Sequence, residues 1–124
     1  MAGSKKIHTY AFDFDGVIAQ YDGFKGANHA EKPIKEVVKA IRILKKQGHK
    51  ILIYSTRGNR FLKKYCQDYN IPIDYFNINP EQGGENKNKP VAYAYIDDRA
   101  VNYHAQSAEK LVKELNNFEV YWKK

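Results

Sequence analysis

The sequence predicts an α/β domain: a mostly parallel β-sheet, doubly wound, with helices on both faces in three layers. Strand-like apolar runs alternate with amphipathic helical stripes along the whole chain, which is the pattern of such sheets. Three of these runs end in acidic or hydroxyl residues, at the sheet edge where α/β proteins bind ligands. A chain of 124 residues is long enough for one hydrophobic core, so we expect a single domain over 1–124.

The first half of the chain predicts a strand, a helix and a second strand. The apolar run Ile7–Phe12 is expected to be a buried strand. Pro33 suits the start of a helix because its φ angle is fixed and it has no N–H to leave unpaired. The stripe that follows has helical spacing and consists of Ile34, Val37, Val38, Ile41 and Leu44. Gly48 ends this helix, and the β-rich run Lys50–Tyr54 predicts the second strand.

The next part of the chain predicts a second helix and two more strands. The helical stripe consists of Phe61, Leu62, Tyr65, Cys66 and Tyr69. It ends near Asn70 and Pro72, and the short run Ile73–Ile78 predicts a third strand. The polar segment Asn79–Asn88 contains two glycines and is expected to be a loop. The run Val91–Ile96 then predicts a fourth strand.

The C-terminal part predicts one more helix and an edge strand. The helix is expected from about Ser107 to Asn116. Its inward face is expected to carry Leu111, Val112 and Leu115. The aromatic run Phe118–Trp122 predicts a strand at the edge of the sheet.

Composition limits the possible partners and compartments. The net charge of +7 favours polyanions or phosphorylated small molecules, although many of the lysines lie on predicted helix faces, where solvent is their ordinary environment. The single cysteine, Cys66, excludes an internal disulfide and belongs to a helical apolar stripe. No apolar run approaches transmembrane length and no signal-peptide core is present at the N-terminus, so we expect a cytoplasmic protein.

The pentapeptide 13–17, Asp-Phe-Asp-Gly-Val, closes the first strand and is the most informative motif. Asp13 and Asp15 lie on one side of the strand because side chains alternate along it. Two like charges there are costly unless a cation or a reacting group compensates them. Gly16 allows the chain to turn sharply behind them. The motif predicts a seat for a divalent metal and a phosphate; an ordinary acidic turn is the alternative.

Three further motifs follow the first one along the chain. The second strand is followed by a Ser-Thr pair, a lysine occurs at Lys89, and the fourth strand ends in Asp97-Asp98-Arg99. This order resembles that of the haloacid dehalogenase-like (HAD) hydrolases over essentially the whole chain. Residues 89–100 are similar to small members that lack a cap domain, and 96–99 also resemble the phosphatase half of polynucleotide kinase-phosphatases. The resemblance implies a HAD-like Rossmannoid fold without a cap domain.

The resemblance implies distinct roles for the acidic residues. Asp13 matches the nucleophile that becomes an aspartyl phosphate, and Asp15 matches the general acid/base. Mg²⁺ is the implied cofactor, bound by Asp13, by the backbone carbonyl of Asp15 and by the Asp97-Asp98 pair. We favour Asp98 as the direct ligand, with Asp97 acting directly or through water. The alternative is that Asp97-Asp98-Arg99 forms a turn with a local ion pair.

The resemblance also assigns the phosphate-binding groups. Ser55 matches the hydroxyl that binds the transferring phosphoryl group, and Thr56 is a competitor because a shift of one residue exchanges them. A Ser-Thr pair here also suits a helix cap. Lys89 matches the lysine that neutralises charge at the site, with Lys87 as the alternative in the same loop. Arg57 is a secondary candidate for substrate binding.

The expected function is Mg²⁺-dependent hydrolysis of a small-molecule phosphomonoester at an open site. Without a cap, Tyr21, Phe24 and His29 in the loop after the first strand are candidates to line its mouth, and a neighbouring subunit is a possible lid. The first alternative is a nucleic-acid 3′-end phosphatase. A second alternative is a receiver-like domain that accepts phosphate without turnover, and a third is a non-catalytic interaction module. We expect no membrane partner, and the substrate stays open.

Overall fold

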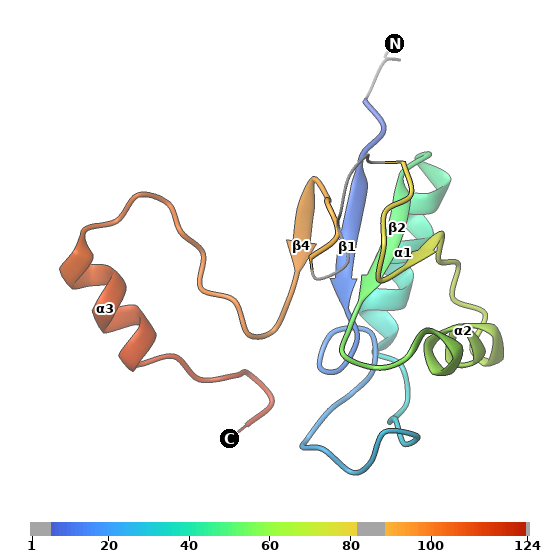
Figure 1. Cartoon of the computed structure of the whole chain (residues 1–124), viewed down its shortest axis with the longest axis horizontal. Helices are drawn as coiled ribbons and strands as arrows, with labels where there is room; N and C mark the ends of the chain where they lie inside the picture. Colours follow the sequence, from blue (N-terminus) through green and yellow to red (C-terminus); the bar gives the residue numbers. More distant parts are fainter. Residues whose placement is uncertain (1–5, 82–88, 124) are drawn as a thin grey trace.

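The structure is a computed structural model that describes residues 6–81 and 89–123. Its centre is a four-stranded, fully parallel sheet in the order β3-β2-β1-β4 (Figure 1). The strands are β1 (Thr9–Asp13), β2 (Lys50–Tyr54), β3 (Tyr75–Phe76) and β4 (Ala94–Ile96). The four predicted strands are therefore confirmed, with β3 and β4 shorter than the apolar runs that contain them.

The order of the strands reverses at β1. The chain steps outward from β1 to β2 to β3, and then returns to place β4 on the other side of β1. Asp13, the last residue of β1, pairs in register with Tyr54 of β2, and Phe12 pairs with Ile96 of β4. The carboxyl end of β1 is thus flanked by strand ends on both sides, at the kind of reversal where open α/β sheets bind ligands.

Two helices cover one face of the sheet. These are α1 (Lys35–Lys46) and α2 (Asn59–Asp68), as the helical stripes predicted. The core on this face combines alternate strand positions with one stripe from each helix, and its members include Phe12, Ile51, Ile53, Val38, Ile41, Leu62 and Cys66. Removing these side chains from water is the main stabilising contribution to this face.

The other face is covered differently from the prediction. Ala11 and Leu52 point to it and are fully buried, yet both helices that pack on the sheet lie on the opposite face. In Figure 1 the chain after β3 passes in front of β2, and on this connection Asn79 and Pro90 are buried. Within the described residues the structure shows an α/β sheet with helices on one face.

The third helix stands away from the sheet. Helix α3 (Ala108–Asn116) is capped by Ser107, whose Oγ accepts a hydrogen bond from the backbone N–H of Lys110 at 3.2 Å. It packs against none of the described strands or other helices, and Figure 1 shows it apart from them. Val112 and Leu115 are 55% and 54% exposed. The helix itself is confirmed, but the prediction that it faces the core is wrong.

The predicted edge strand over 118–122 is also wrong, because residues 121 and 122 form a turn and the segment pairs with none of the described strands. Its aromatic side chains make contacts beyond the ends of β1 and β4 instead, as described below. No helix of the described chain is both long enough and apolar enough to cross a bilayer.

Candidate active site

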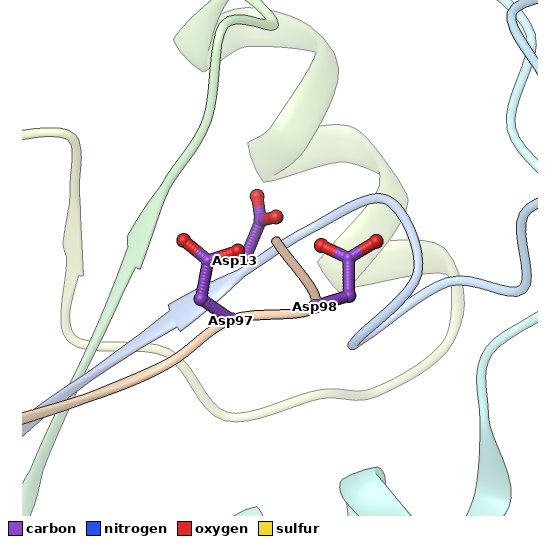
Figure 2. A group of neighbouring side chains, drawn as sticks. All are labelled: Asp13, Asp97 and Asp98. Carbon is purple, nitrogen blue, oxygen red and sulfur yellow. The ribbon is translucent and has the colours of Figure 1, made fainter. Parts of the chain in front are cut away.

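Three carboxylates converge at the carboxyl ends of β1 and β4. Asp13 ends β1, and Asp97 and Asp98 directly follow β4. Because β1 and β4 are neighbours in the sheet, carboxylate oxygens from all three residues lie within 4.8 Å of one another. Figure 2 shows the three side chains side by side. The sequence predicted this convergence.

Hydrogen bonds from outside the cluster hold the two adjacent carboxylates. The Tyr54 hydroxyl donates to Asp97 Oδ2 at 2.5 Å, and the Arg99 backbone N–H donates to Asp97 Oδ1 at 2.8 Å. The Trp122 indole donates to Asp98 Oδ2 at 2.6 Å. Burial, and then the Asp97 carboxylate, raise the pKa of Tyr54, so Tyr54 keeps the proton that it donates. Asp97 therefore has both oxygens occupied, whereas Asp98 has one.

The remaining oxygen of Asp98, Oδ1, is buried and has no hydrogen-bond partner among the described residues. Such an orphaned acceptor is costly and indicates a position that a cation would occupy. The three carboxylates form an all-oxygen donor set, which is what hard divalent cations prefer. The residues therefore fit a divalent metal.

The electrostatics of Asp13 point the same way. Burial above all, and then the neighbouring Asp98 and Asp97 carboxylates, raise the pKa of Asp13 from 3.8 to about 8. The backbone N–H of Phe14 donates to Asp13 Oδ1 at 2.7 Å and partly opposes this increase. Three carboxylates this close cannot all ionise without a compensating charge. A cation bound at this cluster would supply that compensation.

Gly16 allows the chain to pass directly behind the cluster. Its φ is +85°, and a Cβ at this position would lie 2.4 Å from Asp98 Oδ2. The backbone carbonyl of Gly16 accepts a hydrogen bond from the Tyr121 hydroxyl at 2.6 Å. Only glycine satisfies both the left-handed conformation and the close approach, as the motif predicted for a sharp turn.

Asp15 is paired with Arg57. The Arg57 Nε and Nη2 atoms donate to the two Asp15 oxygens at 2.9 and 3.0 Å. Arg57 Nη1 also donates to the carbonyl of Ala27 at 2.9 Å, and its guanidinium lies 4.9 Å from the Phe61 ring centroid. The Arg57 side chain is only 6% exposed. Sequence reasoning gave Arg57 a secondary place, but the structure makes it the direct partner of Asp15.

A cavity of about 210 Å³ lies at the carboxyl ends of the strands. Its lining consists of Asp13, Asp15, Tyr21, Ser55, Thr56, Asp98 and Arg99. Ser55 Oγ accepts a hydrogen bond from the Arg57 backbone N–H at 3.1 Å, and the Ser55 N–H donates to Asn77 Oδ1 at 2.7 Å. Ser55 and Thr56 both line this cavity, so the structure leaves both as candidates to bind a phosphoryl group.

Other predicted residues lie elsewhere. Lys89 is not among the residues that line the cavity; its Nζ lies 4.7 Å from the Tyr95 ring centroid. Lys87 lies outside the described residues. Of the three candidates for the mouth, Tyr21 lines the cavity, Phe24 lines a larger adjoining groove, and the exposed His29 contacts Glu31 at 2.8 Å.

Sequence reasoning missed Tyr54, Tyr121 and Trp122. All three reach the site or its backbone through contacts between residues far apart in sequence. Tyr54 closes a predicted strand, and its position at the carboxyl end was an available indication. The two C-terminal aromatics have no local pattern that indicates a site.

Comparison with known proteins identifies a similar fold. No model of a known protein family matches this chain, and no curated protein matches it. A solved structure of a conserved protein from Bacteroides thetaiotaomicron is similar over 90% of this chain and 90% of that chain, with a TM-score of 0.63 and 22% sequence identity. At this identity the similarity shows the fold alone, and it is consistent with an α/β fold over the matched part of the chain.

Proposed function

We propose that this protein is a Mg²⁺-dependent phosphomonoester hydrolase of the capless HAD type, acting on a small phosphorylated molecule through an aspartyl phosphate on Asp13. One observation carries the proposal. Asp13, Asp15 and Asp98 line one small cavity with Ser55, at the carboxyl ends of parallel strands where the strand order reverses. The three-layer HAD-like arrangement is part of the proposal.

The metal would be held by Asp13, by Asp98 and by the backbone carbonyl of Asp15. When bound, Mg²⁺ keeps Asp13 ionised near neutral pH and offsets charge on the phosphoryl group. Two observations support this assignment: Asp98 Oδ1 is buried without a hydrogen-bond partner in the part of the chain that the structure describes, and the pKa of Asp13 is raised. A cation would relieve both.

Asp13 is the nucleophile in this proposal. A carboxylate oxygen of Asp13 attacks phosphorus, and the bond from phosphorus to the leaving oxygen breaks as the acyl phosphate forms. Water then attacks the same phosphorus, releases inorganic phosphate and regenerates the carboxylate. The Phe14 N–H holds one Asp13 oxygen, which leaves the other to react.

Asp15 moves the proton in both steps. It protonates the leaving oxygen in the first step and takes a proton from the attacking water in the second. A protonated oxygen cannot accept from Arg57, so Asp15 must give up one of its two hydrogen bonds each time it holds a proton. A substrate phosphate offers Arg57 an alternative anionic partner, and its arrival would free Asp15.

Positive charge for the phosphoryl group is available without Lys89. Arg99 lines the site cavity, and Arg57 is paired with Asp15, which lines the same cavity, whereas Lys89 contacts the Tyr95 ring. We therefore propose that the two arginines carry the larger share, with Lys89 contributing only if its side chain turns toward Asp13.

Phosphate release from p-nitrophenyl phosphate and a panel of phosphomonoesters tests the proposal, with Mg²⁺ and with EDTA. The panel includes an oligonucleotide with a 3′-phosphate. We expect turnover that requires the metal, is lost in Asp13→Asn and persists in Asp68→Asn, which removes an exposed carboxylate on α2. Turnover confined to the oligonucleotide would replace the small-molecule substrate by a nucleic-acid end. No turnover by folded protein on any substrate would overturn hydrolysis in favour of phosphate binding or acceptance.

A further inference from the structure

We infer that Trp122 is a positioning residue for the metal site: its indole N–H holds Asp98 Oδ2 and thereby reserves Asp98 Oδ1 for the metal. The inference rests on the metal site of the proposed function. It assigns a role to a segment far from the sequence motifs, because Trp122 follows Asp98 by 24 positions.

The two oxygens of Asp98 have opposite environments. Oδ2 accepts from Trp122 Nε1 at 2.6 Å, a short bond to a charged acceptor. Oδ1 is buried without a partner among the described residues. A donor that fixes one oxygen of a carboxylate fixes the direction of the other, and outer hydrogen bonds of this kind orient metal ligands in proteins.

The indole is itself held from several sides. The Tyr21 ring meets it edge-on, with 4.8 Å between the centroids, and the Arg99 guanidinium lies 5.4 Å from its ring centroid. These contacts come from the turn after β1 and from the chain after β4, so the donor is positioned by the same elements that carry the carboxylates.

Indole chemistry favours this role over simple packing. The indole N–H only donates, so it needs an acceptor when partly buried, and Asp98 is the acceptor it has. A phenyl ring at position 122 would keep much of the contact with Tyr21 and Arg99 but would leave both Asp98 oxygens without a donor. Asp98 would then be free to rotate.

The residue also provides its own probe, since Trp122 is the one tryptophan of the chain. Its donor atom contacts a carboxylate proposed to bind metal, so charge arriving at Asp98 changes the electrostatic environment of the indole. We expect the intrinsic fluorescence of the wild type to change on addition of Mg²⁺, and to remain constant in Asp98→Asn.

Calorimetric titration with Mg²⁺ tests the role, using the full chain. We expect Trp122→Phe to weaken Mg²⁺ binding about 10- to 100-fold, as loss of an outer-shell partner does. Tyr121→Phe is the matched control, because it removes a neighbouring hydrogen bond to backbone and leaves Asp98 held. We expect its affinity to stay within about threefold of the wild type. In an Asp98→Asn background, Trp122→Phe is expected to cause no further loss.

Several outcomes would overturn the inference. If Trp122→Phe binds Mg²⁺ as tightly as the wild type, or loses no more affinity than Tyr121→Phe, Trp122 is a structural anchor only. In that case the proposed function still stands, because the wild type binds the metal. A wild type that binds no Mg²⁺ would remove both the inference and the metal site. If Trp122→Phe does not fold, the fluorescence of the wild type tests the role instead. The role is refuted if this fluorescence stays constant on addition of Mg²⁺ while calorimetry records Mg²⁺ binding.

Discussion

Replacing Asp13 by asparagine is expected to stabilise the metal-free protein. The cluster forces Asp13 to keep a proton, since burial and the neighbouring carboxylates raise its pKa from 3.8 to about 8. Asparagine is neutral, has nearly the same shape, and its Oδ1 can still accept from the Phe14 N–H. The substitution therefore removes the like-charge repulsion and keeps the local hydrogen bond.

The sign and size of this stabilisation follow from the linkage between proton binding and folding. A carboxyl whose pKa is higher in the folded state contributes stability that is complete below pH 3.8 and is lost as pH rises to about 8. At about 1.4 kcal/mol per pKa unit the full loss would be several kcal/mol. Because Asp13 is only partly buried, solvent screens part of this, and we expect Asp13→Asn to gain about 2 kcal/mol at pH 8.

Urea denaturation in EDTA between pH 4 and pH 8 measures this gain. The difference between variant and wild type should grow steadily with pH over this range. Asp68→Asn, at an exposed position paired with Lys64, should change stability by less than about 0.5 kcal/mol at every pH. Adding Mg²⁺ should stabilise the wild type more than the variant, because a ligand stabilises the state that binds it. A variant less stable than wild type at pH 8, or a difference independent of pH, would refute the electrostatic argument.

Three further predictions concern other positions. Gly16→Ala should lower the free energy of unfolding by about 1–3 kcal/mol and weaken Mg²⁺ binding, since the new Cβ would lie 2.4 Å from Asp98 Oδ2; chemical denaturation and calorimetry measure the two effects, and an unchanged affinity would contradict this geometry. Arg57→Lys should reduce kcat/KM about 10- to 100-fold, because lysine cannot form the two-pronged pair with Asp15; steady-state kinetics measures it, and activity equal to wild type would remove Arg57 from the site. Val112→Gln on α3 should shift stability by less than about 0.5 kcal/mol, as its side chain is already exposed; a large loss in thermal melting would show that α3 is covered in solution.

The central part of the fold could be predicted from the sequence because local patterns there agree with tertiary packing. The run over β2 is apolar at successive positions, and Ile51, Leu52 and Ile53 are all buried, as strands inside a parallel sheet require. The stripes of α1 and α2 likewise match the faces they bury. In contrast, the stripe of α3 gives a helix but not a partner, because periodicity identifies an apolar face without stating what lies against it.

Part of the site could likewise be predicted from the sequence, and part could not. Asp13, Asp15, Ser55 and Asp98 could be placed together because each ends or follows a strand, and parallel strand ends share one edge. The Asp15–Arg57 pair and the Trp122–Asp98 hydrogen bond could not, because they depend on where loops fold back. The error over 118–122 has this cause: strand propensity described the aromatic residues, but contacts with Gly16 and Asp98 decided their conformation.

The closure of the chain on its own first loop has a consequence for folding kinetics. The hydrogen bond from Tyr121 to Gly16 joins residues 105 positions apart, whereas the β1–β2 pair joins residues about 41 positions apart, as in Thr9 with Lys50. Closing a longer loop costs more chain entropy, and contacts of long sequence separation slow folding. We expect the β1–β2 pair and α1 to form in the rate-limiting step, and the pairing of β4 with β1 and the C-terminal contacts to follow it. Substitutions at Tyr121 should therefore accelerate unfolding and leave the folding rate nearly unchanged.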